Sequence, residues 1–273
     1  MVRPAQKYVE GEYEHVQAEQ VADVYRIAMD RPEKYNAWNH QLMAEMRSAF
    51  IDANQSDARV VVLTGNGKAF SAGGDFDDWE DEREDPHDWW NNEPGDFLYR
   101  SILDLRQPLI VRLNGVAAGG GAVIAGFGDI IIASEEARIG TTHVNVGLSV
   151  PTTSILWPHS MSLYKAKELL MTGELLDAEE AKEYGLVNHV VPHDELDAKV
   201  DEMIDKLASG PQYAIQYTKL VLNRWVEFSM TQFRGEANAL EAMAASNPDH
   251  TEGVRAIIED RDPEFPSARD DDD

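Results

Sequence analysis

Two glycine-rich stretches decide how this chain folds: Lys68-Ala69-Phe70-Ser71-Ala72-Gly73-Gly74-Asp75 and Asn114-Gly115-Val116-Ala117-Ala118-Gly119-Gly120-Gly121. Each follows a short apolar run typical of a buried strand, residues 59–64 before the first and 108–113 before the second. A glycine-rich turn between a strand and a helix leaves backbone N–H groups unpaired at the helix N-terminus. Two such turns side by side can direct two N–H donors at one oxygen, which stabilises an oxyanion during a reaction.

Around these stretches, strands and helices alternate. Residues 12–30 predict two strands joined by a turn, and Asn39 is suited to cap the helix that follows it. Further strands are expected at 59–64, 108–113 and 129–133, and helices at 40–54, near 96–106 and at 120–127. This alternation favours an α/β fold with a parallel sheet and right-handed βαβ connections.

From about residue 160 the pattern becomes helical, with one short strand expected at 186–191. Apolar residues at helical spacing predict helices at 162–172, 178–184, 194–208, 211–225, 229–246 and 249–260. The sequence therefore predicts a core over residues 1–200, a helical region over 201–265 and an acidic tail over 266–273.

The composition is that of a soluble globular protein with an unusual charge. Hydrophobic residues make up 43% of the 273, there is no cysteine, and 50 acidic residues face 24 basic ones for a net charge of −26. Acidic residues are spread along the chain, which favours adaptation to a salt-rich cytoplasm over a basic partner or a divalent-ion buffer. The charge excludes nucleic-acid binding as a function. No apolar run is long enough to span a membrane, and a cytoplasmic location is expected.

The order and spacing of the motifs resemble the crotonase (enoyl-CoA hydratase/isomerase) superfamily from about residue 20 to residue 265. The similar segments are the loop 31–39, the first signature 61–75, the second signature 114–130 and later landmarks at 170–173, 178–181, 185–188 and 252–265. The resemblance implies a spiral of ββα turns with a C-terminal helical trimerisation region, and a homotrimer or dimer of trimers. It also implies an acyl-coenzyme A thioester substrate, with no separate cofactor and no metal.

Roles carried over by position place the thioester oxygen between the backbone N–H groups of Ala72 and Gly120. Small residues there let an acyl carbonyl approach the backbone closely. The resemblance further implies substrate contacts at Lys68, which is placed to meet a nucleotide phosphate, and at Trp38, Gly73, Gly74 and Asp75. Asp75 also fits a purely structural role, because aspartate is common at turns and helix starts.

The sequence departs from the family where its hydratases carry two glutamates that activate a water. The corresponding positions hold Val123, two residues after Gly121, and His143, three residues after Gly140. Paired-carboxylate hydration is therefore unavailable. An imidazole is a competent acid or base near neutral pH, so His143 is a candidate for the single acid/base group, or else a polar residue of the pocket.

Other histidines and tryptophans are weaker candidates. His87 lies in an acidic segment, His159 is placed to face the pocket or a neighbouring subunit, and Trp79, Trp89 and Trp90 are suited to line a bulky acyl pocket. The remaining histidines lack metal-ligand spacing; they are His15, His40, His189, His193 and His250.

Three functions remain open from the sequence. With one proton-transfer group, double-bond isomerisation or another enolate reaction of an acyl-coenzyme A fits better than hydration. His143 and the segments 86–89 and 157–159 also resemble parts of the 6-oxocamphor hydrolase branch, whose members cleave a C–C bond of a cyclic β-diketone. That branch uses an additional His and an Asp, where this chain has Gly120 and the stretch 150–153. The third hypothesis is a catalytically silent binding protein, against which the intact glycine signatures argue.

Overall fold

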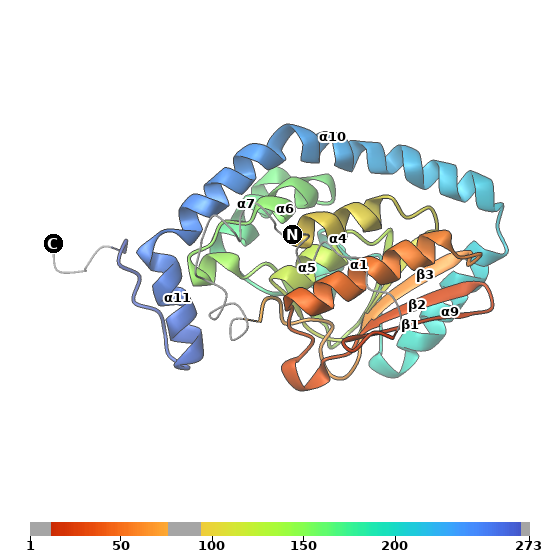
Figure 1. Cartoon of the computed structure of the whole chain (residues 1–273), viewed down its shortest axis with the longest axis horizontal. Helices are drawn as coiled ribbons and strands as arrows, with labels where there is room; N and C mark the ends of the chain where they lie inside the picture. Colours follow the sequence, from red (N-terminus) through yellow and green to blue (C-terminus); the bar gives the residue numbers. More distant parts are fainter. Residues whose placement is uncertain (1–11, 76–93, 269–273) are drawn as a thin grey trace.

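A six-stranded sheet forms the centre of the molecule (Figure 1), in a computed structural model that describes residues 12–75 and 94–268. The strand order is β1-β2-β3-β4-β6-β9. β1 pairs with β2 in antiparallel fashion, and every later neighbour is parallel. The strands are β1 (Val16–Val21), β2 (Val24–Met29), β3 (Val60–Gly65), β4 (Leu109–Leu113), β6 (Ile130–Ser134) and β9 (His189–Val191). The predicted α/β sheet is confirmed, including the hairpin within residues 12–30.

Helices cover both faces of this sheet. One face packs against α1 (His40–Gln55), α4 (Pro94–Leu103) and α5 (Gly120–Ala125), around large enclosed side chains such as Phe50 and Leu63. The other face packs against α9 (Leu196–Ala208) through Leu196, Val200 and Ile204. Residue 200, where the sequence predicts that the core ends, therefore lies inside α9, which packs on the sheet.

The first helix begins as the sequence predicts. Asn39 has an extended backbone, and its Oδ1 accepts a hydrogen bond from Leu42 N at 2.8 Å. This side-chain acceptor satisfies one of the orphan donors of the first turn.

A second, three-stranded sheet was not expected from the sequence. It has the order β5-β7-β8 and is made of β5 (Ala117–Ala118), β7 (Arg138–Gly140) and β8 (Leu176–Asp177). Strands of two or three residues are too short to show an alternation of apolar and polar residues, so the sequence pattern does not predict them. The short helix α6 (Pro151–Leu156) and the 3-10 turns η3 (His143–Val146) and η4 (Trp157–His159) are likewise too short to be predicted.

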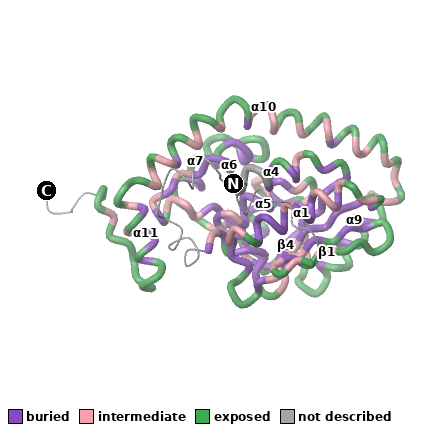
Figure 2. Tube along the Cα trace, in the orientation of Figure 1, coloured by how far each residue is buried: buried purple, intermediate pink, exposed green. Residues whose placement is uncertain are grey.

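The remaining helices follow the sequence pattern with one correction. Those after α6 are α7 (Leu163–Thr172), α8 (Ala178–Glu183), α10 (Gln212–Ala245) and α11 (Pro248–Ile258). The two helices expected at 211–225 and 229–246 are a single helix, α10, because no proline or capping residue interrupts residues 226–228. α10 runs along the outside of the molecule, with α11 at one end (Figure 1), and much of its outer surface is exposed (Figure 2).

Candidate active site at the two glycine-rich turns

The two glycine-rich turns lie side by side. Ser71 forms a parallel bridge with Ala117, and Ala118 N donates to Ser71 O at 2.9 Å. Gly73 has φ +96°, and a Cβ there would lie 2.9 Å from Ala118 O and 3.3 Å from Gly120 N. Only glycine fits this backbone conformation at this separation. The turns are therefore held in contact by their backbones, as the sequence predicts.

The available N–H donors differ from the predicted pair at one position. Ala72 N donates to Tyr35 O at 2.9 Å, so this amide is already used within the chain. Within the described ranges 12–75 and 94–268, neither Gly74 N nor Gly120 N has a hydrogen-bond acceptor, and both residues are partly accessible. The assignment of Ala72 as an oxyanion donor is thus wrong. The partly accessible amides of Gly74 and Gly120 are therefore the candidate oxyanion donors.

Trp38 lies over the Gly120 turn. Its backbone N–H donates to Gly73 O at 2.6 Å, its backbone forms a bridge with Gly74, and the residue is 4% exposed. A Cβ on Gly120 would lie 3.0 Å from Trp38 Cε3. The indole therefore forms an apolar wall beside the open amide, where it strengthens electrostatic interactions by excluding water.

Asp75 has a structural role. Its carboxylate is 4% exposed and pairs with Arg31 Nη2 at 2.9 Å, while Lys34 Nζ lies 3.8 Å away. Arg31 Nη1 also donates to Ala37 O at 2.6 Å. This buried ion pair fastens the loop 31–38 to the first glycine-rich turn, and it removes the Asp75 side chain from the predicted substrate-binding residues.

Lys68 is exposed at the start of the first turn. Its backbone oxygen packs closely on Gly115, where an added Cβ would lie 2.0 Å from that oxygen. The backbone is thereby held in place while the ammonium group extends into solvent, and its predicted contact with a substrate phosphate stays a prediction.

His143 lies beside the second turn. It is the first residue of η3, and a Cβ on Gly119 would lie 3.8 Å from His143 Cε1. Its Nδ1 is enclosed and has no hydrogen-bond partner among the described residues. Burial lowers the pKa of His143 from 6.5 to about 4, so the imidazole is neutral at pH 7. The structure thus brings His143 next to the Gly119–Gly120 backbone, as its sequence position predicts.

Further unpaired polar atoms lie close to His143 in the sequence, on both sides of it. Oγ1 of Thr141, Oγ of Ser149 and Oγ1 of Thr153 are enclosed without a hydrogen-bond partner in the described part of the chain. Buried polar groups are nearly always satisfied by protein, water or ligand. Hydroxyl groups such as these were not singled out from the sequence, which gives no signal for whether a serine or threonine finds a partner.

Other candidates lie outside this site. His159 Nε2 is 3.0 Å from Ser229 Oγ, and this hydrogen bond ties η4 to α10. His87, Trp79, Trp89 and Trp90 fall outside the described residues. Within the described ranges, no group of three His, Cys, Asp or Glu residues is placed to hold a metal ion. Nor does any helix there have the length and apolarity needed to cross a membrane.

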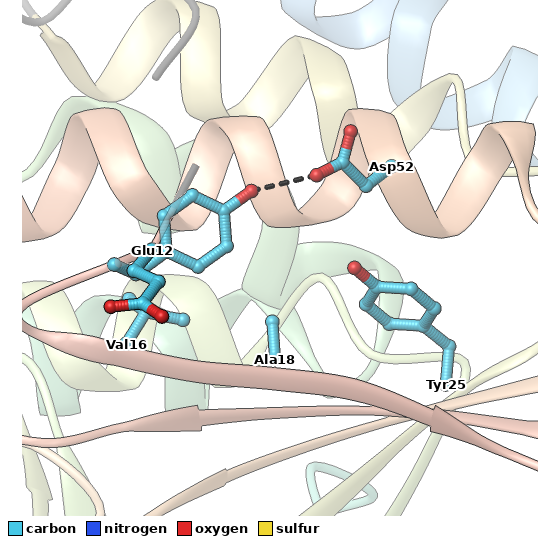
Figure 3. A pocket seen from close by; sticks show the side chains of 6 residues that line it. Glu12, Val16, Ala18, Tyr25 and Asp52 are labelled. Carbon is cyan, nitrogen blue, oxygen red and sulfur yellow. Dashed lines mark hydrogen bonds between the residues drawn. The ribbon is translucent and has the colours of Figure 1, made fainter. Parts of the chain in front are cut away.

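Two surface hollows are separate from the glycine-rich turns. One, of about 420 Å³, lies between β1 and α1 and contains Tyr13, whose Oη donates to Asp52 Oδ2 at 2.8 Å (Figure 3). The other, of about 360 Å³, lies at the C-terminal end of α5 and contains Trp157 and His159. Neither contains Gly74, Gly120 or His143.

A spiral α/β core that presents two open amides from adjacent glycine-rich turns is the crotonase type of fold. The profile of the family "Enoyl-CoA hydratase/isomerase" matches residues 19–268. A crystal structure of an enoyl-CoA hydratase from Mycobacterium avium subsp. paratuberculosis superposes with a TM-score of 0.84 at 26% identity, over 94% of this chain and all of that one. The chain therefore belongs to the enoyl-CoA hydratase/isomerase family, which supports its being an enzyme of the hydratase or isomerase type.

The relatives include both reaction types. A probable mitochondrial enoyl-CoA hydratase of Dictyostelium discoideum is 33% identical over 87% of this chain and 85% of its own length. The 1,2-epoxyphenylacetyl-CoA isomerase of Escherichia coli K12 is 29% identical over 89% of this chain and 94% of its own. Similarity alone therefore does not select the reaction.

Proposed function

We propose that this protein is an acyl-coenzyme A enzyme that moves a proton on a thioester enolate, with double-bond isomerisation as the reaction class. The observation that carries the proposal is the pair of open amides at Gly74 and Gly120 beside His143, whose imidazole is neutral and whose Nδ1 is enclosed. Two N–H donors aimed at the thioester oxygen stabilise the negative charge that develops when a proton leaves the α or γ carbon. Coenzyme A enters as part of the substrate, and no further cofactor is proposed.

His143 is proposed as the single acid/base group. A neutral imidazole removes a proton from one carbon of the acyl chain, and the enolate forms while its oxygen accepts from the two amides. The imidazolium then returns the same proton to another carbon, and the double bond shifts. Since its pKa is lowered to about 4, the protonated ring is a strong acid and returns the proton readily.

Hydration through two carboxylates is not proposed. Val123, at one of the two positions where family hydratases carry a glutamate, is 3% exposed and packs in the main apolar cluster. A side chain without a polar atom cannot hold or activate a water. One proton-transfer group suffices for isomerisation, whereas paired activation of water needs two.

We also propose that the protein assembles as a homotrimer or a dimer of trimers. α10 exposes large apolar side chains along one stripe, with Tyr213, Tyr217, Val221 and Trp225 at successive intervals of four residues. Residues four apart on a helix share a face. Their exposed fractions, 60–75%, support a surface that another subunit covers.

The test is a mass-spectrometric screen of crotonyl-CoA, 3-enoyl-CoA, aromatic acyl-CoA thioesters and coenzyme-A-free cyclic β-diketones. It is run in molar salt, because the net charge of −26 supports adaptation to high ionic strength. Migration of the double bond in 3-enoyl-CoA, without hydration of crotonyl-CoA, supports the proposal. Turnover of the diketones alone would favour the C–C hydrolase, and no turnover with tight thioester binding would favour the silent binding protein.

A further inference from the structure

The 3-10 turn η3, which carries His143, lies between the C-terminal end of α7 and α11. On one side, Asn145 Nδ2 donates to Gly173 O at 3.4 Å, just after α7. On the other side lies α11, where a Cβ on Gly253 would stand 2.6 Å from Val146 Cα. Gly147 closes η3 with φ +66°, and a Cβ there would stand 2.7 Å from His250 N. Backbone therefore meets backbone at the α11 contact, which leaves no room for η3 to shift toward α11.

One buried hydrogen bond fastens this contact. His250 Nδ1 lies 2.7 Å from Val146 O, and the residue is 8% exposed. A carbonyl oxygen can only accept, so Nδ1 carries the hydrogen. The bond satisfies a carbonyl at the end of η3 that would otherwise be buried without a donor. We call the contact of His250 and Gly253 on α11 with Val146 and Gly147 of η3 the α11 latch.

The latch reaches His143 because η3 is one small rigid unit. Gly147 N donates to Val144 O at 3.1 Å, and Leu148 N donates to His143 O at 3.0 Å. A displacement at Val146 therefore carries His143 with it.

The charged side chains of α11 near the latch are engaged elsewhere. Glu252 pairs with Arg261 at 2.5 Å and accepts from Glu264 N at 2.8 Å, and this pairing lowers the pKa of Glu252 to about 2. Asp249 accepts from Ser267 N at 2.9 Å. These contacts bind the segment that follows α11 back onto the helix.

We propose that His250 and Gly253 are positioning residues for His143, so that the C-terminal helix α11 sets the geometry of proton transfer. The inference rests on the proposed role of His143. A displacement of about 1 Å of a reacting group can cost on the order of 100-fold in rate. Loss of the latch is therefore expected to lower kcat about 10- to 100-fold, with little change in KM, because the Gly74 and Gly120 amides lie in other turns.

The test compares His250→Asn with His250→Gln in the full-length chain. The Asn side-chain N–H stands at the same number of bonds from the backbone as Nδ1 of histidine, so it can keep the bond to Val146 O. The Gln N–H lies one bond further out and cannot occupy the same place. We expect His250→Asn to retain kcat, and His250→Gln to lose it. Thr251→Leu, at an exposed neighbour on α11, is the control and should have no effect.

NMR titration of the His143 imidazole provides a readout independent of turnover. In the wild type and in His250→Asn the ring should titrate near 4; in His250→Gln the value should move toward 6.5, because a displaced ring is better solvated. Equal kcat and equal His143 titration in folded Asn and Gln variants would overturn the inference. If His143→Gln is itself fully active, the proposed function fails, while the His143 titration still reports whether the latch positions the ring.

Discussion

The glycine-rich turns and the helix α10 differ in how far their groups are engaged within the chain. In the turns, backbone groups pair with one another across short distances, and the partly accessible amides of Gly74 and Gly120 have no acceptor among the described residues. In α10 only three of 34 residues are buried, compared with nine of 16 in α1. Lys219, one of the three, anchors the helix through Asp129 at 2.6 Å and Gln107 O at 2.8 Å.

This difference indicates which region is suited to bind a substrate and which is suited to pack against another protein surface. In the turn region, the open amides of Gly74 and Gly120 are the donors that we propose a substrate oxygen satisfies. α10 exposes apolar side chains that gain free energy only when another surface covers them, at roughly 25 cal/mol per Å² buried. Changes in the turn region should therefore alter chemistry, whereas changes on α10 should alter assembly.

The largest expected effect is that of His143→Gln. Glutamine keeps a polar side chain of similar reach but cannot transfer a proton, so kcat should fall roughly 10²- to 10⁴-fold. Because the pKa of His143 is lowered to about 4, wild-type activity should stay level through neutral pH and fall only as the pH drops through that value. His159→Gln, at the hydrogen bond to Ser229, is the matched control. Loss of turnover in His159→Gln with retention in His143→Gln would move the base to His159.

Substitutions at Gly120 test whether its backbone N–H takes part in the reaction. Proline at the first position of a helix is tolerated, so Gly120→Pro removes the N–H of α5's first residue with the helix retained. Gly120→Ala adds the same Cβ against Trp38, at 3.0 Å, but keeps the N–H. The proline variant should turn over about 10²- to 10³-fold more slowly than the alanine variant. Equal rates in the two would remove Gly120 from the oxyanion hole.

The same reasoning separates what the sequence could predict from what it could not. The six-stranded sheet, the Asn39 cap and the contact between the two turns follow from apolar period, capping chemistry and glycine content. The choice between Ala72 and Gly74 as the open amide does not follow from them, because it depends on Tyr35, whose carbonyl reaches Ala72 N only in the folded loop. From its residue type alone His143 is an acid or base near neutral pH, and the lowering of its pKa to about 4 depends on burial that no local pattern encodes.

His143 also makes stability depend on pH. Its folded-state pKa is lowered below the unfolded value of 6.5, so its contribution is fully present above pH 6.5 and is lost as the pH falls toward 4. The loss amounts to at most about 3 kcal/mol of the free energy of unfolding at pH 4, and about 2 kcal/mol at pH 5. Urea unfolding at pH 7 and pH 5 measures it, with His143→Gln as reference. Equal losses in wild type and variant would mean that His143 is solvated.

The smallest effect on the fold is expected on α10, where a substitution should alter assembly and leave the subunit folded. Trp225 is 66% exposed, so Trp225→Glu removes few contacts within the subunit and should change its unfolding free energy by no more than about 0.5 kcal/mol. A carboxylate in the middle of the apolar stripe would be desolvated in an assembled protein, and light scattering should show smaller particles than the wild type. Thr231→Glu introduces the same charge at an exposed polar position of α10 and should leave the mass unchanged. If Trp225→Glu keeps the wild-type mass at micromolar concentration, the stripe is not the assembly surface.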